Sequence, residues 1–184
     1  MNRIILFCGL PLSGKSTLAR ILANRLKIPY YDIDEIRHRF FQNPREEMSQ
    51  EANLFQMGIS YEALFLVTES LSKLGRDIVV SATFSGKRAQ NNIIEISRRN
   101  NAPIKAIYCH ASDEIIKERL ACREKNKDSF STCRTWEHYE RDKAKYGVPP
   151  LDVLTVDTSI SQAKNLEKII NFLKILRIFR WFLK

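Results

Sequence analysis

Short apolar runs alternate along the chain with longer stretches in which apolar residues recur every three or four positions. Short runs of aliphatic and β-branched residues indicate buried strands, and the longer spacing indicates helices that pack on a core. The pattern predicts strands at residues 3–8, 29–33, 78–81, 104–109 and 153–156. It predicts helices at residues 15–26, 34–41, 49–74, 87–99, 113–122 and 161–184.

Regular alternation of strands and helices is typical of a mainly parallel sheet with helices on both faces. Residues 123–146 depart from the pattern, because they are rich in charge and poor in aliphatic side chains, and we expect an exposed, partly helical segment there. Ligands of such folds bind at the carboxyl ends of the strands. We expect four strand ends to lie together at this edge of the sheet: Cys8–Gly9, Asp32–Asp34, Ser81–Thr83 and His110.

Composition supports one compact domain, since the 184 residues are 44% hydrophobic and 28% charged. The formal net charge of +9 favours a phosphate-rich or otherwise anionic ligand. No apolar run reaches the roughly 20 residues of a spanning helix. The four cysteines form no CxxC pair and fit no compact zinc pattern, so we expect free thiols and a cytoplasmic location.

The first predicted strand runs directly into GLPLSGKS at residues 9–16, which is the pattern G-x-x-x-x-G-K-[ST]. Its glycines allow the backbone to wrap a phosphate, its lysine reaches the β- and γ-phosphates, and its serine hydroxyl ligates Mg²⁺. A strand before the loop and a helix after it are the context that this motif requires. The residues expected to bind ATP are Gly9, Leu10, Pro11, Leu12, Ser13, Gly14, Lys15, Ser16 and Thr17.

Two acids follow the second predicted strand. Asp32 and Asp34 face the same way if both are extended, and Arg37 shares a helix face with Asp34. A carboxylate here can accept the proton of an acceptor hydroxyl, and an arginine can hold a substrate anion. Asp32 is the predicted second magnesium ligand beside Ser16. The alternative is a helix-capping aspartate followed by a surface arginine.

The third predicted strand ends at Ser81, where many phosphate-handling proteins carry a metal-binding acid. A serine can bind a metal-bound water but brings no charge. Because Mg²⁺ needs only one or two protein ligands besides water and phosphate oxygens, Ser16 and an acid after the second strand can supply them. We therefore predict weaker metal binding than in a variant with an acid at this position, and not the loss of the metal.

Several segments resemble the small AAA-type P-loop kinase family: GLPLSGKSTLA, DIDEIR, IVVSATFSGKRAQ, an R-L-x-x-R helix and VDTS. The family includes the kinase domain of polynucleotide 5′-hydroxyl kinases, and the chain resembles chloramphenicol phosphotransferase and zeta-toxin kinases less closely. The resemblance implies a three-layer α/β P-loop NTPase fold with a five-stranded parallel sheet over residues 1–176 and a mobile lid at about 123–146. It implies that Asp34 is the catalytic base, that Arg37 holds the acceptor and that Arg123 is the lid arginine.

Arg119 and Arg123 lie four residues apart, on one face of a predicted helix, and Arg134 follows after a polar stretch. Arginines on a closing segment can neutralise the charge that develops during phosphoryl transfer. We assign this role to Arg123, together with Lys15, and expect Arg119 to be structural; a solvated charged helix is the alternative. The aromatic residues Trp136 and Tyr139 can stack on a base or pack on the domain.

The C-terminal residues 163–184 carry a net charge of +5, from six cations and one glutamate. We expect their first half to be the last core helix and residues 177–184, RIFRWFLK, to be a basic aromatic extension. Such a helix can contact an anionic membrane surface or a partner. The alternative is a long helix that packs across the domain, with its cations reaching solvent.

These features predict an ATP-dependent kinase that uses Mg²⁺ and transfers the γ-phosphoryl group to a hydroxyl of a small-molecule, nucleotide or polynucleotide acceptor. Two alternatives stay open: an ATP-binding regulatory module without phosphoryl transfer, and a zeta-toxin-like nucleotide-sugar kinase. The sequence identifies neither the acceptor nor the oligomeric state, and it leaves nucleic acid open as a partner.

Overall fold

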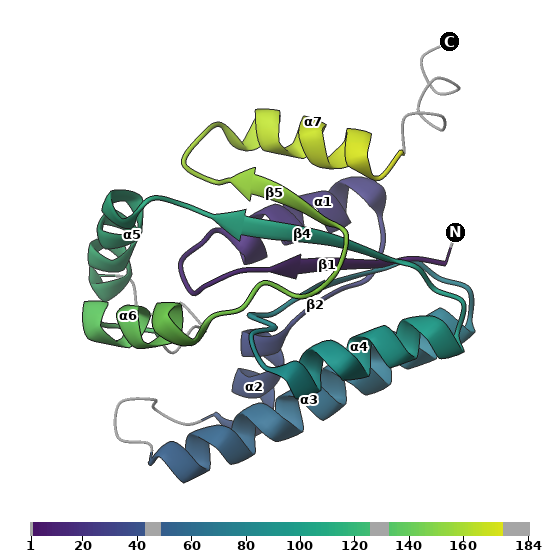
Figure 1. The fold of residues 1–184 in the computed structure, drawn as a ribbon, viewed down its shortest axis with the longest axis horizontal. Helices are drawn as coiled ribbons and strands as arrows, with labels where there is room; N and C mark the ends of the chain where they lie inside the picture. Colours follow the sequence, from purple (N-terminus) through teal and green to yellow (C-terminus); the bar gives the residue numbers. More distant parts are fainter. Residues whose placement is uncertain (1, 43–48, 126–132, 175–184) are drawn as a thin grey trace.

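The computed structural model describes residues 2–42, 49–125 and 133–174. One parallel sheet with strand order β2-β3-β1-β4-β5 crosses the molecule (Figure 1). Its strands are β1 (Ile4–Cys8), β2 (Tyr30–Asp32), β3 (Ile78–Ser81), β4 (Ile104–His110) and β5 (Val153–Asp157). The helices are α1 (Lys15–Leu26), α2 (Ile33–Phe41), α3 (Gln50–Lys73), α4 (Lys87–Arg99), α5 (Asp113–Lys125), α6 (Trp136–Lys145) and α7 (Gln162–Phe172).

The central strand β1 shows why the sheet has a helical layer on each face. Its side chains alternate between two cores. Ile4 and Leu6 belong to the core beneath α2, α3 and α4, while Ile5 and Phe7 belong to the core beneath α1 and α7. Figure 1 shows these two layers above and below the sheet. The predicted three-layer α/β fold with a five-stranded parallel sheet is therefore confirmed.

The register of the edge strand β2 matters most for the site. In the pairing of β2 with β3, Asp32 is the neighbour of Ser81. Strand β3 in turn pairs with β1, which leads into the GLPLSGKS loop. The expected convergence of these strand ends at one edge of the sheet is confirmed.

Several helix limits differ from the prediction by one residue or more. Helix α2 begins at Ile33, because the Asp32 side chain caps it by accepting from the Asp34 amide. Helix α5 continues past Cys122 to Lys125. Helix α7 ends at Phe172, where Arg3 donates to the carbonyl oxygen of Leu173 and the backbone turns left-handed at Lys174 with φ 53°.

Other expectations fall partly or wholly outside the described ranges. The basic aromatic extension at 177–184 lies outside them, as does the middle of the segment predicted as a lid. The described ends of that segment form the end of α5 and the whole of α6. Within residues 2–42, 49–125 and 133–174, no helix is long and apolar enough to cross a membrane.

Candidate active site

The loop between β1 and α1 forms a cradle that only glycine permits at two positions. Gly9 has φ 143°, and a Cβ there would lie 2.3 Å from the carbonyl oxygen of Cys109 on β4. Gly14 has φ 79° and is the N-cap of α1, with no side-chain cap hydrogen bond. The first amide groups of α1 are therefore left for another acceptor. An uncapped helix N-terminus behind a tight glycine loop fits a phosphate group.

Lys15 adds a positive charge to this cradle. Its side chain is largely buried, and its Nζ donates to the carbonyl oxygen of Leu10 at 3.3 Å. Among the ion pairs of the described residues, none joins Lys15 to a carboxylate. A buried ammonium group is costly unless an anion accompanies it, so the charge also fits the phosphates of a nucleotide.

The predicted magnesium ligands meet next to the cradle. Ser16 Oγ donates to Asp32 Oδ2 at 2.7 Å and lies 3.3 Å from Ser81 Oγ. Asp32 Oδ2 also accepts from Tyr30 Oη at 3.0 Å, and Asp32 Oδ1 accepts from the amide of Asp34 at 2.9 Å. An acid is therefore present beside Ser81 although β3 itself ends in a serine, because Asp32 lies at the end of the neighbouring strand β2.

This oxygen set fits Mg²⁺, which takes hard oxygen ligands and usually keeps several waters. No group of three or more His, Cys, Asp or Glu side chains that could hold a metal occurs in the described part of the chain. A cation held by Ser16 and Asp32 would therefore complete its shell with water and phosphate oxygens. The fit is to a nucleotide-bound cation and not to a metal site made of protein alone.

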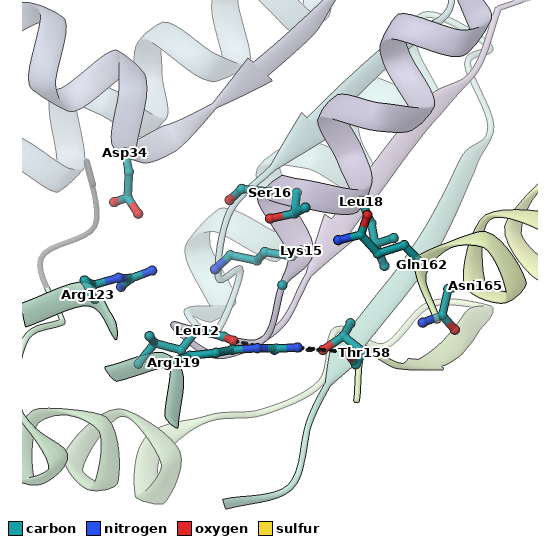
Figure 2. A pocket seen from close by; sticks show the side chains of 12 residues that line it. Leu12, Lys15, Ser16, Leu18, Asp34, Arg119, Arg123, Thr158, Gln162 and Asn165 are labelled. Atoms are coloured by element: carbon teal, nitrogen blue, oxygen red, sulfur yellow. Dashed lines mark hydrogen bonds between the residues drawn. The ribbon is translucent and has the colours of Figure 1, made fainter. Parts of the chain in front are cut away.

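The cradle opens into a cavity of about 310 Å³. Figure 2 shows Asp34 from α2 and Arg123 from α5 directed toward the space beside Lys15. Arg119 and Thr158 lie below Lys15 in this view, and Gln162 and Asn165 come from α7. The complete lining is Leu12, Gly14, Lys15, Ser16, Thr17, Leu18, Asp34, Arg119, Arg123, Thr158, Gln162 and Asn165.

The two arginines of α5 have different contacts. Arg119 donates to the carbonyl oxygen of Leu12 at 2.8 Å, and to Oγ1 and the carbonyl oxygen of Thr158 at 2.9 and 2.8 Å. Arg123 makes a longer hydrogen bond, 3.4 Å, to the carbonyl oxygen of Cys133. Burial lowers the pKa of Arg123, while the Asp34 carboxylate acts in the opposite direction. Arg119 has the anchoring contacts expected of a structural residue, although it also lines the cavity.

Arg37 lies away from the cavity lining. It is 4% exposed, and its Nε and Nη2 donate to Gln56 Oε1 at 3.1 Å and Asn53 Oδ1 at 2.8 Å on α3. Burial lowers the pKa of this guanidinium, and Asp34 acts against the shift. These contacts join α2 to α3. The expected role of Arg37 in holding the acceptor stays a prediction.

The aromatic residues of α6 pack on the domain. Tyr139 is buried in a small core with Leu10 and Leu12 of the loop. The ring of Trp136 lies 5.1 Å from that of Tyr139 and beneath the Lys117 ammonium, 4.6 Å from its centre. The structure therefore favours the packing interpretation over base stacking for these two rings.

The sequence alone did not identify the residues after β5 and in α7 that line the cavity, which are Thr158, Gln162 and Asn165. Thr158 Oγ1 lies 2.8 Å from the carbonyl oxygen of Ser13 and 3.0 Å from that of His110. Asn165 is buried and donates to the carbonyl oxygen of Asp157 at 2.7 Å. The signal available was the VDTS segment at the end of the last strand, because a polar strand end at this edge should reach the site.

A family model described as an AAA domain matches residues 4–145. The chain belongs to this AAA domain family. Shikimate kinase from Clostridium beijerinckii is 32% identical over 93 residues, which are 50% of this chain and 52% of that relative. The matched region thus spans about half the length of this relative.

Solved structures of this family's fold are similar over nearly the whole chain. A candidate kinase from Chloroflexus aurantiacus has a TM-score of 0.76 at 20% identity, covering 92% of this chain and 97% of that one. The Mycobacterium tuberculosis APS kinase CysC, solved with AMPPNP and APS, has a TM-score of 0.64 at 17% identity, covering 94% and 98%. At these identities the likeness shows a P-loop kinase fold.

Proposed function

We propose that the chain is an ATP-dependent kinase that transfers the γ-phosphoryl group to a hydroxyl of a small-molecule acceptor. The observation that carries the proposal is that Lys15, Ser16, Asp34 and Arg123 line one cavity. Asp32 lies behind Ser16, whose hydroxyl donates to its carboxylate. The family match and the similarity to a shikimate kinase support it.

In this proposal the nucleotide phosphates lie in the cradle, against the free amide groups of α1 and the Lys15 ammonium. The nucleoside end extends toward Arg119, Thr158 and Gln162, which line the same cavity. Ser16 and Asp32 would hold Mg²⁺, which would supply positive charge to neutralise the nucleotide phosphates.

The acceptor hydroxyl lies at the side of the cavity where Asp34 and Arg123 face Lys15 (Figure 2). Asp34 accepts the hydroxyl proton as the acceptor oxygen bonds to the γ-phosphorus, and the bond between that phosphorus and the leaving ADP oxygen breaks. Lys15 and Arg123 balance the negative charge of the transferring group. Asp34 lies in the first turn of α2, so a rigid element positions it.

The experiment is a transfer assay with γ-labelled ATP and a panel of hydroxyl acceptors. The panel contains shikimate, adenosine 5′-phosphosulfate, a sugar acid, a nucleotide sugar and an oligonucleotide with a 5′-hydroxyl. The last is included because the net charge of +9 suits a polyanion. Label in one product would support the kinase and name its acceptor class.

The matched pair of variants is Asp34→Asn and Glu35→Gln. Asp34 lines the cavity, whereas Glu35 is paired with Arg20 at the surface. Removal of a positioned base typically lowers the rate about 10²- to 10⁴-fold, so kcat should fall by this amount for Asp34→Asn. The ATP affinity of Asp34→Asn should stay near that of wild type. The kcat and ATP affinity of Glu35→Gln should also stay near the wild-type values. Transfer at full rate by Asp34→Asn would refute the role of the base. A protein that binds ATP and Mg²⁺ but labels no acceptor would favour the regulatory module.

A further inference from the structure

Tyr30 lies in the edge strand β2, close to the acid that we propose for the magnesium site. It precedes Asp32 by two residues in β2, so both side chains point to the same face of the sheet. This is the face covered by α1, and the Tyr30 ring packs against the core there. The intervening Tyr31 packs against the core on the opposite face.

The Tyr30 hydroxyl contacts the same carboxylate oxygen that faces the predicted magnesium site. Its Oη donates to Asp32 Oδ2 at 3.0 Å, and Ser16 Oγ donates to this oxygen at 2.7 Å. The other carboxylate oxygen accepts from the amide of Asp34 at 2.9 Å. The carboxylate of Asp32 is therefore held at both oxygens, from its own strand and from the first turn of α2.

The ring that carries this hydroxyl is also fixed. The Arg20 guanidinium lies over the Tyr30 ring, 5.8 Å from its centre, and is paired with Glu35. Tyr30 Oη lies 3.5 Å from the carbonyl oxygen of Ser16, so the phenol bridges the start of α1 and the end of β2. Because the Tyr30 ring is fixed, its hydroxyl can restrict the orientation of the Asp32 carboxylate.

We propose that Tyr30 is a positioning residue for the magnesium ion, because its hydroxyl holds Asp32 Oδ2 against Ser16. The inference rests on the proposed function, in which Ser16 and Asp32 would hold the ion. The end torsion of an aspartate is broad and roughly two-fold, so an unsupported carboxylate samples orientations that do not face Ser16. The end of β3 provides the neutral Ser81 in place of an acid. The charge for binding the cation therefore comes from Asp32, and the orientation of its carboxylate has a larger effect on cation affinity.

A purely structural role makes a different prediction. If the hydrogen bond to Asp32 only satisfies a half-buried phenol, its removal lowers stability and leaves cation affinity alone. If it orients the carboxylate, its removal weakens cation binding, as removal of groups that orient metal ligands does elsewhere. Cation binding can be measured without catalysis, so the two roles are separable.

The test uses the whole protein, AMPPNP and Mn²⁺, with bound Mn²⁺ followed by electron paramagnetic resonance. Tyr30→Phe removes the hydroxyl and keeps the ring; Tyr31→Phe is the matched control on the opposite face. Loss of an orienting group typically costs 10- to 100-fold in metal affinity, so we expect the dissociation constant of Mn²⁺ to rise about tenfold for Tyr30→Phe. It should stay within twofold of wild type for Tyr31→Phe. AMPPNP affinity in EDTA should not differ among the three proteins.

The same change in an Asp32→Asn background shows whether Tyr30 acts through Asp32. In that background, removal of the Tyr30 hydroxyl should change the dissociation constant of Mn²⁺ by less than twofold, because the charged oxygen that the hydroxyl positions is gone. Equal Mn²⁺ affinity for wild type and Tyr30→Phe, or an undiminished tenfold effect in the Asp32→Asn background, overturns the inference and leaves the kinase proposal standing. Wild-type protein that binds neither AMPPNP nor its Mn²⁺ complex overturns the kinase proposal itself.

Discussion

Replacing Ser81 with aspartate puts a carboxylate where the sequence lacks one, beside the acid that we propose for the magnesium site. Ser81 is 0% exposed and Asp32 is 4% exposed, so neither carboxylate of the variant could turn to solvent. Ser16 Oγ lies 2.7 Å from Asp32 Oδ2 and 3.3 Å from Ser81 Oγ; as two sides of a triangle, these distances put the latter two atoms no more than 6.0 Å apart.

At this upper limit of 6.0 Å, two unit charges repel by about 3 kcal/mol at an effective dielectric constant of about 20. Without a cation, the Ser81→Asp variant should therefore be less stable than wild type by about this amount. For a chain of this size, 1 kcal/mol corresponds to about 2–4 °C in Tm, so the predicted decrease is about 6–12 °C. With a divalent cation between the carboxylates, attraction replaces repulsion, and affinity should rise between about tenfold and a hundredfold.

Thermal unfolding in EDTA and Mn²⁺ titration of the AMPPNP complex measure the two effects. Ser85→Asp is the matched control, because it makes the same change at an exposed position after β3. The reasoning fails if Ser81→Asp melts like wild type in EDTA, or if it binds Mn²⁺ no more tightly. Either result would mean that Ser81 and Asp32 do not face a common cation.

The exchange variant Asp32→Ser with Ser81→Asp completes this experiment. It keeps one acid at the site and moves that acid from β2 to β3. Serine is also a good N-cap, so the start of α2 should survive the change. We expect the Tm in EDTA to return to within a few degrees of wild type and Mn²⁺ binding to persist.

Two further predictions concern the cradle and the buried thiols. Gly9→Ala should abolish detectable AMPPNP binding by calorimetry, since its Cβ would meet the β4 backbone at 2.3 Å, whereas Gly86→Ala, with open space, should bind normally. Burial raises the pKa of Cys8 and of Cys133 to about 11 from 9.0. The folded state thus resists their ionisation, and the stability in urea should be full below pH 9 and fall toward pH 11; Cys122→Ser, at an exposed thiol, should not alter this profile.

Most of the sheet edge was predictable because its determinants are local. The GLPLSGKS loop specifies its own backbone, and the strand ends at Asp32 and Ser81 follow from short apolar runs. Parallel strands bring their carboxyl ends together without further information. The sequence could thus predict that these side chains share an edge, but not that Tyr30 Oη and Ser16 Oγ share one carboxylate oxygen, which depends on the register of β2 against β3.

The environment of Arg37 could not be predicted in the same way. Helix α3 buries polar side chains, among them Gln56 and Ser60, so its inward face cannot be identified from hydrophobicity alone. Asn53 and Gln56 lie three residues apart and meet the guanidinium together. Thr158 was signalled by the VDTS segment, but the contribution of Asn165 was hidden, because it depends on where α7 lies beside the cavity.

The contrast between Arg119 and Arg123 shows what the packing adds to a sequence pattern. Four residues apart on α5, they are one turn apart on one helix face, so spacing alone treats them as equivalent cations. In the structure, Arg119 joins α5 to the loop through Leu12 and to the end of the sheet through Thr158. Arg119 is thus fixed at both places, whereas Arg123, one turn further along α5, lines the cavity and makes a longer hydrogen bond of 3.4 Å to the carbonyl oxygen of Cys133. These contacts distinguish an anchoring arginine from the one that we propose for the transferring group.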